Sequence, residues 1–105
     1  MKEIKIKREN KELRAELLCE IDHHTAKTVR EEIDREMLSS VPERLILDFS
    51  GVTFMDSSGI GLILGRVAKA EPYGIFIEVV GLSPSLLKLV RMSGIEKIRS
   101  IKIKD

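Results

Sequence analysis

Two largely apolar segments in the second half of the chain constrain its fold more than any other feature of the sequence. Arg44 to Phe49 contains the run Leu45-Ile46-Leu47, and Ile75 to Val80 is the second such segment. Short runs of this kind are typical of strands that are buried on both faces of a sheet. Helical patterns stand between and after them, so we predict a mostly parallel sheet whose strands are joined by crossover helices.

The N-terminal part alternates polar with apolar side chains, which is the period of a half-buried strand. Glu3 to Lys7 places Ile4 and Ile6 on one face. After a polar turn at residues 9–11, a second segment places five apolar residues on one face: Leu13, Ala15, Leu17, Cys19 and Ile21. Two such segments joined by a short polar turn predict an antiparallel hairpin.

Apolar residues at helical spacing predict three helices. The first opens at Asp22-His23-His24-Thr25, where Asp22, His24 or Thr25 could supply the cap, and it leaves Asp34 on the outside. The third opens at Ser83-Pro84 and ends at Gly94. The residues expected to face the core are Ala26, Val29, Ile33 and Met37 in the first helix, Ile60, Ile63, Leu64 and Val67 in the second, and Leu86, Leu89 and Val90 in the third.

A last, weaker strand is predicted at Ile98, Ile101 and Ile103, which completes the order ββαβαβαβ. The chain has 105 residues, of which 43% are hydrophobic and 33% charged, and this suits one globular domain with a modest core. We therefore expect a single α/β domain over residues 1–105. Its sheet should be mixed and mostly parallel, with about five strands and three or four packed helices.

Composition excludes several classes of partner. Eighteen basic and seventeen acidic residues give a net charge of +1, and aromatic residues make up 4%, so neither nucleic acid nor an anionic membrane is expected to bind. No apolar run approaches the length of a membrane span or of a signal peptide, which predicts a cytoplasmic protein. The single cysteine, Cys19, rules out an internal disulfide, and its apolar surroundings predict a buried thiol. Well-mixed charges on the outer helix faces favour a monomer.

The stretch from Leu45 to Arg66 is the most informative about function. A buried strand leads through a short loop into a helix that starts at Asp56-Ser57-Ser58-Gly59. The first N–H groups of a helix lack intrahelical partners and carry partial positive charge, so an anion is stabilised there. Two interpretations stay open: Asp56 or Ser57 merely caps the helix, or Ser57 accepts a phosphoryl group. Gly59, Gly61 and Gly65 destabilise this helix unless close packing or a docking partner needs bare backbone.

Two motifs then carry a resemblance to a known family. Asp22-His23-His24-Thr25-Ala26, followed by Phe54-Met55-Asp56-Ser57-Ser58-Gly59, resembles the anti-sigma factor antagonists of the STAS domain family, above all those that act in sporulation. The resemblance extends over essentially the whole chain, although the family usually has Gly where Cys19 stands. It implies that Ser57 is phosphorylated by the anti-sigma factor, a serine kinase that uses ATP. It also implies that Asp56 supports this serine and that Asp22 helps to contact the kinase.

The implied function is a switch between partners. The unphosphorylated chain would bind the nucleotide-bound anti-sigma factor and release a sigma factor, and a phosphoserine phosphatase would reverse the modification. The surface expected to contact the kinase comprises Asp22, His23, Asp56, Ser58, Gly59 and Ile60. No cofactor and no metal are expected.

Four other functions compete with this one. A hydrolase using Ser57 with His23 or His24 lacks the Gly-x-Ser-x-Gly elbow, so no catalytic residue is assigned. A metal site at the adjacent histidines lacks further ligands at suitable spacing. Nucleotide binding by the chain itself lacks a phosphate-binding loop. The serious alternative is a STAS scaffold, or an antagonist of the stress-response branch.

Overall fold

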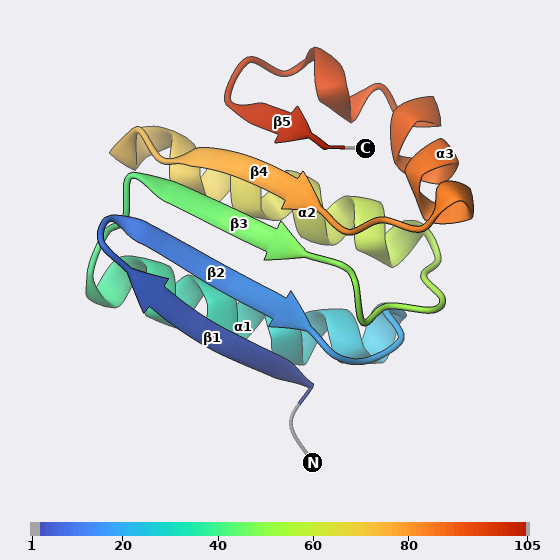
Figure 1. Cartoon of the computed structure of the whole chain (residues 1–105), viewed down its shortest axis with the longest axis horizontal. Helices are drawn as coiled ribbons and strands as arrows, with labels where there is room; N and C mark the ends of the chain where they lie inside the picture. The colour runs from blue at the N-terminus through green and yellow to red at the C-terminus, as the bar shows by residue number, and fades with distance from the viewer. Residues whose placement is uncertain (1–2, 105) are drawn as a thin grey trace.

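The computed structural model describes residues 3–104 and contains one five-stranded sheet, three α-helices and two short 3₁₀ turns (Figure 1). In chain order the elements are β1 (Ile4–Glu9), β2 (Glu12–Leu17), α1 (His23–Ser39), β3 (Arg44–Asp48), α2 (Ser57–Ala70), η1 (Glu71–Tyr73), β4 (Phe76–Val80), α3 (Pro84–Met92), η2 (Ile95–Lys97) and β5 (Ile101–Ile103). The strands lie in the order β1-β2-β3-β4-β5, with β1 antiparallel to β2 and all other neighbours parallel. The predicted mixed α/β fold and its element order are confirmed.

The hairpin between β1 and β2 turns at Asn10 and Lys11. Glu9 still pairs with Glu12, so β1 runs further than the predicted end at Lys7. Asn10 has a φ of 57°, a left-handed conformation that asparagine tolerates better than most residues. The register places Ile4 opposite Leu17 and therefore on the same face of the sheet.

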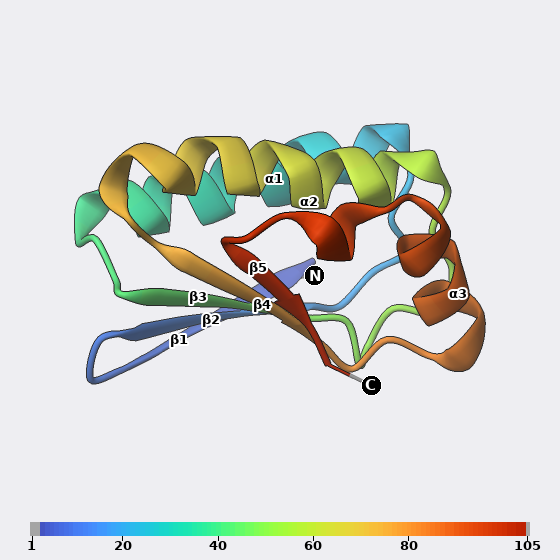
Figure 2. The ribbon, with the colours of Figure 1, turned by 90° about the horizontal axis from the view of Figure 1, so that it is seen from above.

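The two long helices cover one face of the sheet and leave the other face without a helical layer. α1 and α2 lie side by side along the same face, and α3 lies at the end of the sheet where the parallel strands finish (Figures 1 and 2). The core forms between this face and the helices, and its fully buried members include Leu13, Leu47, Ile63, Ile77 and Val79. Because α1 and α2 follow parallel strands, both helices begin at the same edge of the sheet.

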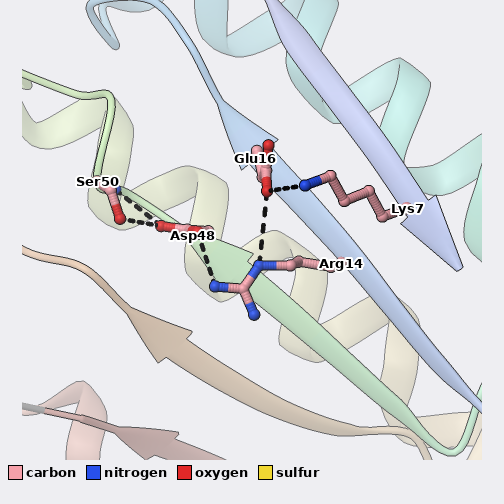
Figure 3. A network of polar contacts seen from close by, with 5 residues as sticks. All are labelled: Lys7, Arg14, Glu16, Asp48 and Ser50. Carbon is pink, nitrogen blue, oxygen red and sulfur yellow. Dashed lines mark hydrogen bonds and ion pairs between the residues drawn. The ribbon is translucent and has the colours of Figure 1, made fainter. Parts of the chain in front are cut away.

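The face without helices carries a ladder of ion pairs (Figure 3). Glu16 lies 3.0 Å from Lys7 and 3.8 Å from Arg14, and Arg14 donates to Asp48 at 2.8 Å. Asp48 is buried and also accepts hydrogen bonds from the backbone and hydroxyl of Ser50. Burial raises the pKa of Asp48, but the hydrogen bonds from Ser50 and Arg14 outweigh it and hold the pKa below its usual range.

The buried face of α2 differs from the prediction. Ile63 and Val67 are buried as expected, but Leu64 is 42% exposed and Ile60 is only half-buried. The buried residues of α2 are Gly59, Leu62, Ile63, Arg66, Val67 and Ala70. The apolar pattern missed this orientation because a glycine and an arginine occupy the inner face. Arg66 is 2% exposed and pairs with Asp34 of α1 at 2.8 Å, so Asp34 is half-buried and does not point outward.

Three smaller predictions are also corrected. β2 ends at Leu17, so Cys19 lies beyond the strand and is half-buried, packed against the core without being sealed inside it. Leu89 of α3 is likewise half-buried. Ile98 ends the η2 turn and does not belong to β5.

Within residues 3–104, no helix combines the length and the apolar character needed to cross a membrane.

Candidate functional site

A backbone bridge holds the starts of α1 and α2 side by side. Ile21 and Met55 form an isolated parallel bridge between the loop after β2 and the loop after β3. The amide of Ile21 donates to the carbonyl of Phe54 at 3.0 Å, and the amide of Asp56 donates to the carbonyl of Ile21 at 3.1 Å. Asp22 and Asp56 follow directly on the two bridged residues. The structure thus brings together the two sequence motifs that lie some thirty residues apart.

The start of α1 is fixed by a capping box. Asp22 Oδ1 accepts from the amides of His24 and Thr25, both at 2.9 Å, and Thr25 Oγ1 accepts from the amide of Asp22 at 3.0 Å. Among the three candidates, Asp22 is therefore the N-cap. The amide of Thr25, and then that of His24, lowers the pKa of Asp22 despite some desolvation. Asp22 is thus ionised at neutral pH.

The start of α2 leaves the hydroxyl of Ser57 free. Asp56 is the N-cap, and its Oδ1 accepts from the amide of Ser58 at 2.8 Å. Ser57 is the first residue of the helix and is exposed. Within residues 3–104 the Ser57 hydroxyl forms no hydrogen bond, and neither His23 nor His24 contacts it as a base would. Capping belongs to Asp56, and the serine after it is accessible from solvent.

The three glycines of α2 have different surroundings. Gly59 is buried, and a Cβ at this position would lie 2.5 Å from the sulfur of the buried Met55, so a larger residue here would force the Met55 side chain to move. At Gly61 and at Gly65 a Cβ would meet nothing within 4 Å. Packing thus explains Gly59 but neither of the other two.

The residues expected to contact a kinase lie at this edge, and all but Gly59 are at least partly exposed. His23, Asp56 and Ser57 are exposed, whereas Asp22, Ser58 and Ile60 are half-buried. Gly59 is buried on the inner side of α2. Within the described part of the chain, no group of three or more His, Cys, Asp or Glu side chains is arranged to hold a metal ion.

Sequence reasoning missed a groove next to Ser58. The groove has a volume of ≈ 310 Å³ and is lined by His23, Ala26, Lys27, Arg30, Ser58, Gly61 and Leu62. Its charged members, Lys27 and Arg30, come from α1, and Ser58, Gly61 and Leu62 come from α2. The spacing of residues 23, 27 and 30 places them on one face of a helix, and this was the signal available in the sequence.

Comparison with known proteins shows the family to which the chain belongs. Residues 6–105 match the STAS domain family. The chain is similar to the anti-sigma F factor antagonist of Paenibacillus polymyxa, with 38% identity over 82 residues that cover 78% of this chain and 70% of the relative. It is similar to the anti-sigma-B factor antagonist of Listeria monocytogenes at 32% identity over 85 residues, which cover 79% and 72% of the two chains.

The fold is that of the anti-sigma factor antagonist SpoIIAA, which has been solved in two forms. The unphosphorylated form matches with a TM-score of 0.74 and 24% identity, covering 97% of this chain and 87% of that one. The phosphorylated form, from Bacillus, matches with a TM-score of 0.68 and 25% identity, covering 97% and 91%.

Proposed function

Because this chain belongs to the STAS domain family, we propose that it is an anti-sigma factor antagonist that phosphorylation of Ser57 switches off. In the unmodified state it binds an anti-sigma factor that is a serine kinase, and a sigma factor is released. The observation that carries the proposal is the free, exposed hydroxyl of Ser57 at the first position of α2, beside the start of α1. A kinase can reach this hydroxyl, and a partner that docks on this edge covers it.

Charge explains how one phosphoryl group acts as a switch. A phosphoserine adds about 1.5 to 2 negative charges at neutral pH. The surface around Ser57 already carries the carboxylates of Asp22 and Asp56, one from each helix start. The free N–H groups of α2 accommodate the phosphate without unfolding the helix. A partner that buries the same phosphate must remove water from it, which costs free energy. A loss of about 2.8 kcal/mol of binding free energy weakens binding a hundredfold.

The partners follow from the same chemistry. The phosphoryl donor, ATP, is bound by the anti-sigma factor kinase, and a phosphoserine phosphatase returns Ser57 to its free state. Since the kinase and its sigma factor act on transcription, the proposal places the chain in the cytoplasm. The antagonist itself is a monomer that serves as substrate and ligand, not as an enzyme.

The test compares Ser57→Asp and Ser57→Ala for binding to the cognate anti-sigma factor in the presence of ADP. Isothermal titration should show at least tenfold weaker binding for the Asp variant and near-normal binding for the Ala variant. Ser85→Asp is the matched control, because Ser85 is an exposed serine near the start of α3. Unchanged binding of Ser57→Asp would refute the switch.

A second candidate shares the fold but differs in its partners. The 32% identity to an anti-sigma-B factor antagonist favours a role in the stress-response branch, and a STAS scaffold is the further alternative. Incubation with ATP and candidate kinases of each branch, followed by mass mapping of the phosphosite, separates the three. Phosphate on Ser57 from one kinase alone identifies the branch, and none from any kinase identifies a scaffold.

A further inference from the structure

The seam between α1 and α2, by which we mean the groove beside Ser58, carries positively charged side chains that have no role in the proposed switch. His23, Lys27 and Arg30 stand one helical turn apart on α1 and line the groove beside Ser58. Within residues 3–104, neither Lys27 nor Arg30 forms an ion pair with a carboxylate. These two cations are thus available to a ligand.

The carboxylate of Asp34, further along α1, is already paired. Asp34, one turn beyond Arg30, pairs with Arg66 of α2 at 2.8 Å. Arg66 is buried, and its Nη1 atom has no hydrogen-bond partner among the described residues. The lining of the groove itself thus includes two permanent cations, Lys27 and Arg30, and no carboxylate. Such an excess favours the approach of an anionic group.

The α2 side of the groove is formed by Ser58, Gly61 and Leu62. A Cβ at Gly61 would meet no atom of the described residues within 4 Å. Glycine inside a helix destabilises it by about 0.8–1 kcal/mol relative to alanine. Among residues 3–104, no neighbour is close enough to Gly61 to require a glycine, whereas an approaching chain would gain the space.

We infer that the groove receives an acidic segment of the anti-sigma factor kinase, with Lys27 and Arg30 contacting its Asp or Glu carboxylates. This inference rests on the proposed function and adds the chemistry of the partner's contact. Ser58 links the groove to the switch, because it lines the groove and directly follows Ser57. A segment held there positions the partner over the serine that it modifies. The carboxylates of Asp22 and Asp56 at the same edge disfavour a polyanion such as nucleic acid, which would meet them too.

The test reverses both charges in Lys27→Glu/Arg30→Glu. We expect at least tenfold weaker binding of the unphosphorylated protein to the ADP-bound anti-sigma factor, and a similar fall in kcat/KM for phosphorylation of Ser57. Wild-type affinity should also decline with rising salt more steeply than that of the variant. The matched control is Lys97→Glu/Arg99→Glu, which makes the same charge change at exposed residues of η2 and of the segment before β5.

The outcomes separate this inference from the function on which it rests. If wild type binds and the double variant binds equally well, the groove is not the docking site, while the proposed function stands. An equal loss in the control would show a general charge effect and would overturn the inference. Failure of wild type to bind any anti-sigma factor would overturn the proposed function itself.

Two further measurements test whether misfolding of the variant or binding of another ligand explains the result. If the Glu variant is unfolded by circular dichroism, Lys27→Gln/Arg30→Gln replaces it and should still weaken binding severalfold. Unchanged binding of that neutral variant would also refute the inference. Binding of wild type, but not of the variant, to a mixed-sequence oligonucleotide without any effect on the kinase would assign the groove to another partner and refute it too.

Discussion

At the scale of single residues, Gly81 shows how a missing side chain secures the end of a strand. Gly81 follows β4 with a φ of 77°, and a Cβ there would lie 2.7 Å from both Asp48 Oδ1 and Ser50 N. The glycine therefore lets the chain pass close to the hydrogen-bonded turn that follows β3. The side-chain alternation of the strands gave no sign of this close approach.

Gly81→Ala should destabilise the protein by more than the backbone strain alone. An L-residue in the left-handed region costs about 1–2 kcal/mol, and the clash with Asp48 and Ser50 adds to it. The control is Gly74→Ala, because Gly74 has a similar φ of 67° but nothing within 4 Å of its Cβ position. Urea unfolding measures both. Equal losses of unfolding free energy in the two variants would contradict the close contact at Gly81.

The residues of the proposed switch could be predicted only in part. Asp22 and Ser57 stand where the motifs placed them, at the starts of two adjacent helices. The cap of α1 could not be chosen from sequence, because three of the four residues 22–25 can accept a backbone hydrogen bond and only the fold selects Asp22. From the sequence, Lys27 and Arg30 look like ordinary solvent-exposed charges of a helix. The groove that they line forms only because α2 packs beside α1.

At the scale of elements, α2 shows why an apolar pattern can misplace a buried face. Leu64 looks like a core residue and Arg66 does not, yet the burial of the two is reversed. The close approach of Gly59 to Met55 and the pairing of Arg66 with Asp34 set the orientation of the helix. Both partners lie outside the helix, one in the preceding loop and one on α1, so no periodicity within α2 encodes them.

The glycines of α2 offer a matched pair of substitutions. Gly61→Ala should stabilise the protein by about 0.8–1 kcal/mol, because the new methyl group meets no atom and helix propensity improves. Gly59→Ala should destabilise it, because its methyl group would overlap the side chain of Met55. Thermal unfolding followed by circular dichroism gives the order of the two variants. Destabilisation by Gly61→Ala would mean that its surroundings are not open.

At the scale of the whole molecule, the order of strands and helices was predictable because strands and helices of clear period alternate along the chain. The parallel arrangement and the hairpin followed from that order and from connection lengths. What could not be predicted is which charged side chains pair with one another on the sheet face that no helix covers. The ladder from Lys7 to Asp48 depends on registers between strands that lie far apart in sequence (Figure 3).

The dependence of global stability on pH follows from the carboxylates described above. Folding lowers the pKa of both Asp22 and Asp48. Their stabilising contribution is complete above the unfolded value of about 3.9 and is lost as the pH falls through the lower folded value. Burial raises the pKa of Asp34, although Arg66 opposes this shift, so Asp34 contributes with the opposite sign. We expect a net loss of unfolding free energy between pH 5 and pH 2.5, in which range unfolded carboxyls take up protons first.

Urea unfolding over that range tests this expectation. Asp22→Asn keeps a residue that caps well but does not titrate, so its profile should be flatter than that of wild type. A variant profile parallel to wild type would show that Asp22 does not contribute.

The bridge between Ile21 and Met55 has a consequence for recognition. Because the two loops are bonded to each other, neither can shift alone when another protein arrives. The unmodified and modified chains would then share one contour and differ only in electric potential. A synthetic peptide whose shape is complementary to this surface should fit both forms. A positively charged group on the peptide would favour the modified form, and a negatively charged group would favour the unmodified form.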